Sequence, residues 1–138
     1  MQALIEDNIL KLFFFDVGLL GYLLEMSYKD QLAQKVSYKG YIAEFFVQNE
    51  LRVNVAYPTY SWEFARGEIE LLLQCENGAI VPVEVKGGAR TRAKRLQSYI
   101  DRYSPSKTIK LIGSVGGNNP NNTRIVWPLY YAKFLGSI

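Results

Sequence analysis

Apolar residues recur along this chain at two spacings, and the spacing predicts where helices and strands lie. Gly40 opens a segment with apolar residues at three- and four-residue steps, which is typical of a buried helix, and Glu44 lies within it. The positions that define this periodicity are Ile42, Phe45, Phe46, Asn49 and Val53. Residues 91–103 predict a second helix, which Pro105 terminates. Its expected core positions are Leu96, Tyr99, Ile100 and Tyr103.

Short β-branched and aromatic runs predict the strands. Residues 55–64 form the first run, and Pro58 indicates an edge strand or a bulge. After a turn at Arg66 and Gly67, residues 68–75 and 79–86 flank Asn77 and Gly78, a strong signal for a hairpin. Residues 108–114 predict a buried strand and residues 116–123 a surface loop. Residues 124–135 predict a closing strand with a short helical turn.

The N-terminal part has a different pattern. Residues 1–9 predict a loose lead-in, and residues 11–15 (KLFFF) predict a short strand. Asp16 follows as a helix N-cap, with Val17, Leu20, Leu23 and Leu24 at helical spacing. Residues 28–39 are polar and predict a loop or a frayed helix. We therefore expect a strand-helix lead-in over residues 1–39 and an α/β domain over residues 40–138, with the order helix, three strands, helix, strand.

Composition narrows the chemistry. The chain has no His and a single Cys, which excludes Ser-His-Asp and Cys-His catalysis, zinc sites that use imidazole, and an internal disulfide. Any metal would therefore be a hard cation held by carboxylates. The apolar stretch 12–24 is interrupted by Asp16 and is too short to cross a bilayer. Without a secretory signal, we expect a cytoplasmic protein that does not enter a membrane. A net charge of +3 permits a nucleic-acid partner.

The candidate chemistry lies at one end of the predicted hairpin. Side chains alternate along a strand, so Glu84 and Lys86 share one face while Val83 and Val85 share the other. The turn at residues 77–78 brings Glu70 close to this pair, and alternation places Glu68 on the same face as Glu70. Two carboxylates suit Mg²⁺ or Mn²⁺, which promotes phosphodiester hydrolysis, and a lysine can orient the attacking water. Such a grouping is also typical of a surface salt-bridge cluster.

Five sequence blocks carry a family resemblance. They are LFFFDVGLL, GYIAEFFVQNEL, GEIELLL, IVPVEVKGG and WPLYYA, and together they extend from about residue 12 to residue 135. This arrangement resembles the PD-(D/E)XK nuclease superfamily, whose restriction endonuclease-like core has the order αβββαβ around a mixed sheet. More narrowly, it is similar to the C-terminal domain of unknown function that follows an AAA-type ATPase module and a winged helix in many prokaryotic proteins.

The resemblance implies a role for each candidate residue. Glu84 and Lys86 match the E-x-K positions, Glu70 matches an acid that is usually Asp, and Glu44 matches the acid of the preceding helix. Glu70, Glu84 and Glu44 would bind Mg²⁺ or Mn²⁺, with Lys86 as a further catalytic residue. The longer side chain of Glu70 is a departure from the family pattern. The ATPase module would precede residue 1, and residues 11–16 would be the tail of the winged helix.

A dense basic run completes the candidate site. It consists of Arg90, Arg92, Lys94 and Arg95. These side chains would hold nucleic-acid phosphates, most simply those of DNA, beside the metal; a solvated helix start is the simpler interpretation. Three functions are open at this point: a metal-dependent nuclease domain, an inactive module that binds nucleic acid or protein for the ATPase, and a structural domain for oligomerisation.

Overall fold

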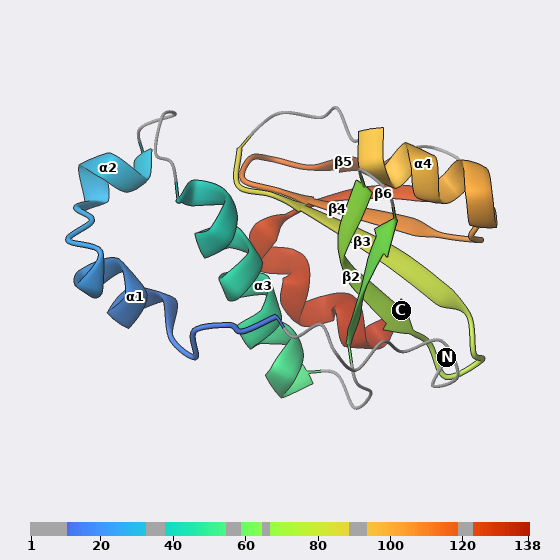
Figure 1. Cartoon of the computed structure of the whole chain (residues 1–138), viewed down its shortest axis with the longest axis horizontal. Helices are drawn as coiled ribbons and strands as arrows, with labels where there is room; N and C mark the ends of the chain where they lie inside the picture. The colour runs from blue at the N-terminus through green and yellow to red at the C-terminus, as the bar shows by residue number, and fades with distance from the viewer. Residues whose placement is uncertain (1–10, 33–37, 55–58, 65–66, 89–93, 119–122) are drawn as a thin grey trace.

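The computed structural model describes residues 11–32, 38–54, 59–64, 67–88, 94–118 and 123–138. Within these ranges the chain forms an α/β fold around a mixed sheet, with helices on both faces (Figure 1). The strand order is β1-β2-β3-β4-β6-β5. The strands are β1 (Tyr60–Phe64), β2 (Gly67–Gln74), β3 (Ile80–Lys86), β4 (Thr108–Ile112), β5 (Gly117–Asn118) and β6 (Arg124–Pro128).

Strand directions divide the sheet into two parts. The β1-β2 and β2-β3 pairs are antiparallel, the β3-β4 and β4-β6 pairs are parallel, and β5 returns antiparallel to β6. β1 is an edge strand, which confirms part of the prediction made from Pro58, although Pro58 and Arg66 themselves lie outside the described residues. The parallel pairs need a crossover, and α4 (Lys94–Tyr103) supplies it between β3 and β4.

The predicted hairpin is confirmed. Gly78 has a φ of +79°, a left-handed conformation that glycine adopts without steric cost. The turn is closed by the N–H of Gly78, which donates to the carbonyl of Cys75, and by the N–H of Ala79, which donates to Asn77 Oδ1. Leu71 then pairs with Val83, and the register continued by one residue brings Glu70 level with Glu84. The turn thus places both acids on neighbouring strands.

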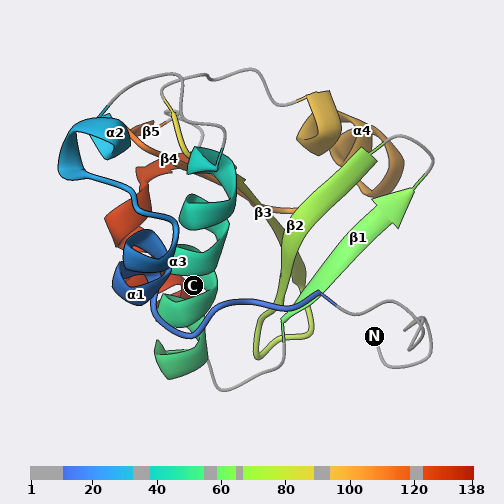
Figure 2. The same cartoon turned by 60° about the vertical axis from the view of Figure 1, so that its left-hand side comes forward.

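Two hydrophobic clusters hold helices against opposite faces of the sheet. On one face, α3 (Lys39–Asn54) and the 3-10 helix η2 (Leu129–Ser137) pack on the larger cluster, which includes Val83 and Ile109 (Figures 1 and 2). On the other face, α4 buries Leu96 and Tyr99 against Ile69 and Leu72. The helices near Ile42 and Leu96 therefore flank the sheet as predicted.

Two of the predicted core faces need correction. The buried face of α3 consists of Ala43, Val47 and Leu51, none of which is in the predicted set, and Val53 is 83% exposed. Apolar residues lie nearly all around this helix, so their spacing alone does not select the face. On α4, Leu96 and Tyr99 are buried as predicted, whereas Tyr103 is 49% exposed.

The N-terminal segment departs from the prediction in one element. Asp16 caps α1 (Val17–Leu23), because its Oδ1 accepts from the N–H of Leu19 at 2.7 Å, and the predicted cap is confirmed. The strand predicted over residues 11–15 is wrong, because these residues are irregular. Phe13 packs edge to face on Phe45 of α3 at 5.6 Å and pairs with no strand. The apolar run therefore serves a helix contact.

Two short elements complete the described chain. The polar segment after α1 contains a short helix, α2 (Tyr28–Leu32), in line with the frayed helix that was one of the two predictions. The loop predicted over residues 116–123 contains the two-residue strand β5, whose pairing with β6 has no signal in its own sequence. In the part of the chain described here, no helix is long and apolar enough to cross a membrane.

Candidate functional site

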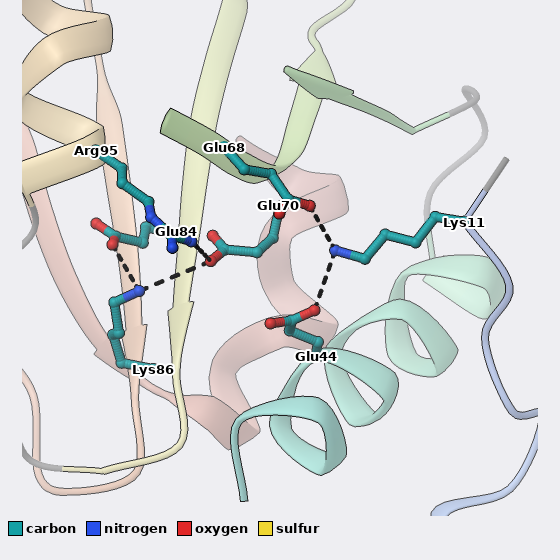
Figure 3. A network of polar contacts seen from close by, with 7 residues as sticks. All are labelled: Lys11, Glu44, Glu68, Glu70, Glu84, Lys86 and Arg95. Carbon is teal, nitrogen blue, oxygen red and sulfur yellow. Dashed lines mark hydrogen bonds and ion pairs between the residues drawn. The ribbon is translucent and has the colours of Figure 1, made fainter. Parts of the chain in front are cut away.

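The E-x-K segment of β3 directs its polar side chains to the α4 face of the sheet. Val83 and Val85 are buried in the core on the α3 side, so Glu84 and Lys86 alternate to the opposite side. Lys86 Nζ lies 2.7 Å from Glu84 Oε1 and 3.7 Å from Glu70 Oε1 (Figure 3). The structure therefore brings these three predicted residues together around one ammonium group.

A register shift in the β1-β2 pair changes how Glu70 and Glu68 are presented. Tyr60 pairs with Leu72 and Trp62 with Ile69, so two steps along β1 match three steps along β2. Such a shift re-aims side chains on the longer strand. Glu68 contacts Lys11, whereas Glu70 contacts Lys86 and Arg95, as Figure 3 shows.

The shift also corrects the predicted alternation along β2. Ile69 packs with Leu72 on the α4 side, although strict alternation would place it with Leu71 and Leu73 in the larger cluster. The predicted grouping of Ile69 with Leu71 and Leu73 is accordingly wrong, whereas the placement of Glu68 on the same face as Glu70 stays a prediction. The physical reason is the local extra residue on β2, which single-strand periodicity cannot reveal.

Burial sets Glu70 and Glu84 apart from surface acids. Their side chains are 7% and 1% exposed. The Oε2 atom of each is buried and has no hydrogen-bond partner among the described residues. A buried carboxylate oxygen without a partner is costly, because it has lost its hydration without replacement. Two such oxygens on neighbouring strands are the donors that a hard cation prefers.

The donor set fits a magnesium-type ion with few protein ligands. Across the described ranges, no group of three or more acidic or cysteine side chains is arranged to hold a metal ion. Mg²⁺ commonly binds through only one or two carboxylates, with water and substrate phosphate supplying the remaining oxygens. Glu70 and Glu84 are two carboxylates of this kind, and Glu44, the third predicted ligand, pairs with Lys11 at 3.1 Å.

The electrostatic surroundings act strongly on Glu70. Burial raises the pKa of Glu70, and the negative charges of Glu84 and Glu44 raise it further, while a backbone hydrogen bond and Lys86 oppose the shift. Arg95 Nη1 lies 3.9 Å from Glu70 Oε1. The raised pKa means that the surrounding positive charges do not fully stabilise the negative charge of Glu70. A divalent cation would supply the missing positive charge.

A second lysine adjoins Glu84, and the sequence prediction missed it. Lys110 occupies the register position beside Glu84 on the parallel strand β4, and it is 5% exposed. Burial lowers the pKa of Lys110, with Glu84 opposing the shift and Lys86 adding to it. The available signal was a lone lysine within an otherwise apolar buried strand, but only the β3-β4 register shows which acid it faces.

A third lysine reaches the site from the N-terminal segment. Lys11 Nζ lies 2.8 Å from Glu68 Oε1 and 3.1 Å from Glu44 Oε2. Partial burial alone would lower the pKa of Lys11, but the hydrogen bond with Glu68 and the charge of Glu44 outweigh it, so the pKa is raised. Because Lys11 is distant in sequence from both acids, no local pattern could have predicted this contact.

The basic run is described only in part. Lys94 and Arg95 are exposed in the first turn of α4, and Arg95 extends to Glu70. Arg90 and Arg92 lie outside the described residues. Of the described residues of the run, Arg95 is therefore adjacent to a candidate carboxylate, as a phosphate-binding role would require.

Comparison of the chain with models of protein families, with curated proteins and with solved structures gives no match in any of the three.

Proposed function

We propose that this chain is a metal-dependent phosphodiesterase domain of the nuclease type, with Glu70 and Glu84 as ligands of Mg²⁺ or Mn²⁺. The observation that carries the proposal is the pair of buried Oε2 atoms without hydrogen-bond partners, directly beside Lys86. A purely structural ion pair between Lys86 and two acids would be expected to satisfy those oxygens. The AAA-type ATPase context and the nucleic-acid substrate belong to the same proposal, because they follow from the sequence resemblance.

The residues of the chain would divide the work as follows. A bound divalent ion supplies a Lewis acid that polarises a phosphoryl oxygen and lowers the pKa of an attacking water. Glu70 of β2 and Glu84 of β3 would hold the ion. Lys86 is 28% exposed on its side chain, so its ammonium can turn from Glu84 towards a substrate and offset developing negative charge. Arg95 and Lys94, at the start of α4, can hold a neighbouring phosphate.

Metal binding is the direct test. We expect Mn²⁺ to bind the unmutated chain in calorimetry, and the Glu70→Gln and Glu84→Gln variants to lose at least about tenfold in affinity. Glu76→Gln is the matched control, because Glu76 is an exposed acid in the β2-β3 turn. Unchanged Mn²⁺ affinity in both site variants would refute the proposed ligands.

Cleavage assays then separate an enzyme from a binding module. The unmutated chain should cleave single- or double-stranded DNA with Mg²⁺ or Mn²⁺, and Lys86→Met should abolish cleavage while preserving most DNA binding. The alternative function, an inactive nucleic-acid- or protein-binding module, predicts Lys86-independent binding with no cleavage by any variant. The presence of Glu70 where the resembling family usually has Asp is the feature that favours this alternative.

A further inference from the structure

The contact between Lys11 and two acids is the strongest feature of the structure that the proposed reaction does not use. Lys11 joins Glu44 of α3 to Glu68 of β2, at 3.1 and 2.8 Å (Figure 3). Glu44 is only 16% exposed on its side chain, so the ammonium reaches into a partly closed position between helix and sheet. This geometry makes Lys11 more than a surface charge.

A ring contact holds the segment that carries Lys11. Phe13 packs on Phe45 with the rings nearly perpendicular, and Phe45 is the residue that follows Glu44 on α3. Lys11 Nζ is also 5.7 Å from the centre of the Phe13 ring. Since residues 11–15 form no helix or strand, these side-chain contacts are what position Lys11. Such a segment can be displaced without breaking backbone pairing.

The charge of Lys11 is coupled to the candidate metal ligands through Glu44. Lys11 joins Glu44 to Glu68, which precedes Glu70 by two residues on β2, so Glu44 and Lys11 both lie next to the strand that carries Glu70 (Figure 3). Lys11 neutralises part of the negative charge of Glu44 by its ion pair with that residue. A divalent ion near Glu70 would be attracted by Glu44 and repelled by Lys11, so the two cations are energetically opposed. If Lys11 only positioned the site, its removal would lower the metal affinity, because the site would then be looser.

We propose that Lys11 is a built-in cation that competes with the divalent ion for Glu44, so that docking of residues 11–13 lowers the metal affinity of the site. The inference rests on the proposed function for the ligands Glu70 and Glu84. It adds an autoinhibitory contact: the site binds metal most tightly when the N-terminal segment is displaced. Anything that binds the segment and withdraws Lys11 would activate the site.

Mn²⁺ calorimetry on single variants tests the sign of the effect. Lys11→Met should bind Mn²⁺ roughly three- to tenfold more tightly than the unmutated chain at low salt, and Lys11→Arg should bind like the unmutated chain. Lys29→Met is the matched control for lost charge, because Lys29 is exposed on α2. In the Glu44→Gln background, Lys11→Met should give little further gain, because the competition passes through Glu44.

The outcomes distinguish this inference from the proposed function. Equal or weaker Mn²⁺ binding by Lys11→Met, with clear binding by the unmutated chain, overturns the inference alone. No binding by either variant overturns both. If Lys11→Met binds Mn²⁺ and the unmutated chain does not, the result supports a Lys11 contact that is strong enough to exclude the metal.

A measurement on the unmutated chain covers the case in which Lys11→Met fails to fold. Trypsin cleaves after lysine, so displacement of Lys11 should expose the bond between Lys11 and Leu12. We expect Mn²⁺ to accelerate this cleavage at least about threefold, measured by mass spectrometry, and Phe13→Ala to accelerate it without metal. A cleavage rate that Mn²⁺ does not change would contradict the proposed competition.

Discussion

Glu70 and Glu84 lie on neighbouring strands and share Lys86, yet the cations around them are distributed unevenly. Lys86 is 1.0 Å closer to Glu84 than to Glu70, at 2.7 against 3.7 Å, and Arg95 approaches Glu70 only to 3.9 Å. Glu70 therefore has weaker ionic partners despite nearly equal burial, and its pKa is raised. Glu70, whose negative charge has the weaker ionic partners, is also the position where the sequence has Glu and the resembling family usually has Asp.

The raised pKa of Glu70 predicts a pH dependence of stability in the absence of metal. The folded protein retains a proton on Glu70 at pH values where the unfolded chain has lost it, so the free energy of unfolding falls as pH rises. The fall begins near the ordinary glutamate value of 4.5 and ends once pH exceeds the raised folded value. Glu70→Gln should remove this component, as measured by urea unfolding with a chelator at several pH values.

The control for this experiment is Glu76→Gln at the exposed turn, which should keep the pH dependence of the unmutated chain. Parallel stability curves for Glu70→Gln and the unmutated chain would show that burial does not act on Glu70 as the structure implies.

At the scale of elements, glycines join β3, β4 and α3 just beyond Lys86. A Cβ on Gly87 would lie 2.5 Å from the carbonyl oxygen of Lys39, and one on Gly113 would lie 2.6 Å from that of Gly87. The N–H of Gly113 donates to the carbonyl of Lys86 at 3.0 Å. The start of α3 and the ends of two strands therefore meet backbone to backbone next to the candidate site.

This close approach predicts that Gly87→Ala is destabilising. The added methyl group would push on the backbone of α3, which cannot move aside cheaply, and we expect a loss of about 1–3 kcal/mol in the free energy of unfolding. Gly88→Ala is a neighbouring control, because a Cβ there meets nothing within 4 Å. Equal stabilities of the two variants in urea unfolding would exclude the tight junction.

The sequence predicted correctly those elements that depend on residues close together in the chain. The β2-β3 hairpin followed from Asn77 and Gly78, and the α1 cap followed from Asp16, because each signal and its effect lie within a few residues. The run at residues 11–15 was misassigned, because four successive apolar residues fit a strand as well as a helix contact. Its contact with Phe45 is tertiary and leaves no local periodicity.

The residues of the candidate site also differ in whether the sequence could predict that they lie together. Glu70, Glu84 and Lys86 could be grouped from sequence, because one turn connects their strands. Lys110 and Lys11 could not, because the first depends on the parallel register of β3 and β4 and the second on a contact 57 residues away. The register shift between Ile69 and Leu72 is likewise a property of the strand pair.

At the scale of the whole molecule, the sheet separates two environments. The α3 and η2 side holds the larger core, and α4 covers the other side (Figures 1 and 2). Alternation with Val83 and Val85 places Glu84 and Lys86 on the α4 side, with the basic start of α4. On the proposed function, a phosphate backbone would meet the proposed metal ligands and the basic residues from this second side. With a net charge of only +3, local charge rather than the charge of the whole chain must guide such binding.

This arrangement predicts how DNA binding responds to salt. Replacing Arg90, Arg92, Lys94 and Arg95 with Ala should weaken DNA binding. It should also flatten the slope of log K against log salt by an amount that corresponds to the loss of up to about four phosphate contacts. A matched variant removes four exposed charges elsewhere: Lys29, Arg52, Lys107 and Lys133. Fluorescence anisotropy at several salt concentrations measures both. A slope that falls equally in the two variants would contradict a specific interface at α4.

The crossover through α4 also bears on the order in which the chain folds. The β2-β3 hairpin closes over a short turn, but the β3-β4 pair forms only once the crossover that contains α4 has closed. Contacts distant in sequence form more slowly, because loop closure precedes any gain from pairing. Glu70 and Glu84 therefore meet early, while water still surrounds them, and lose that water when α4 closes. We expect their dehydration to slow the late step of folding, and Mn²⁺ to accelerate it.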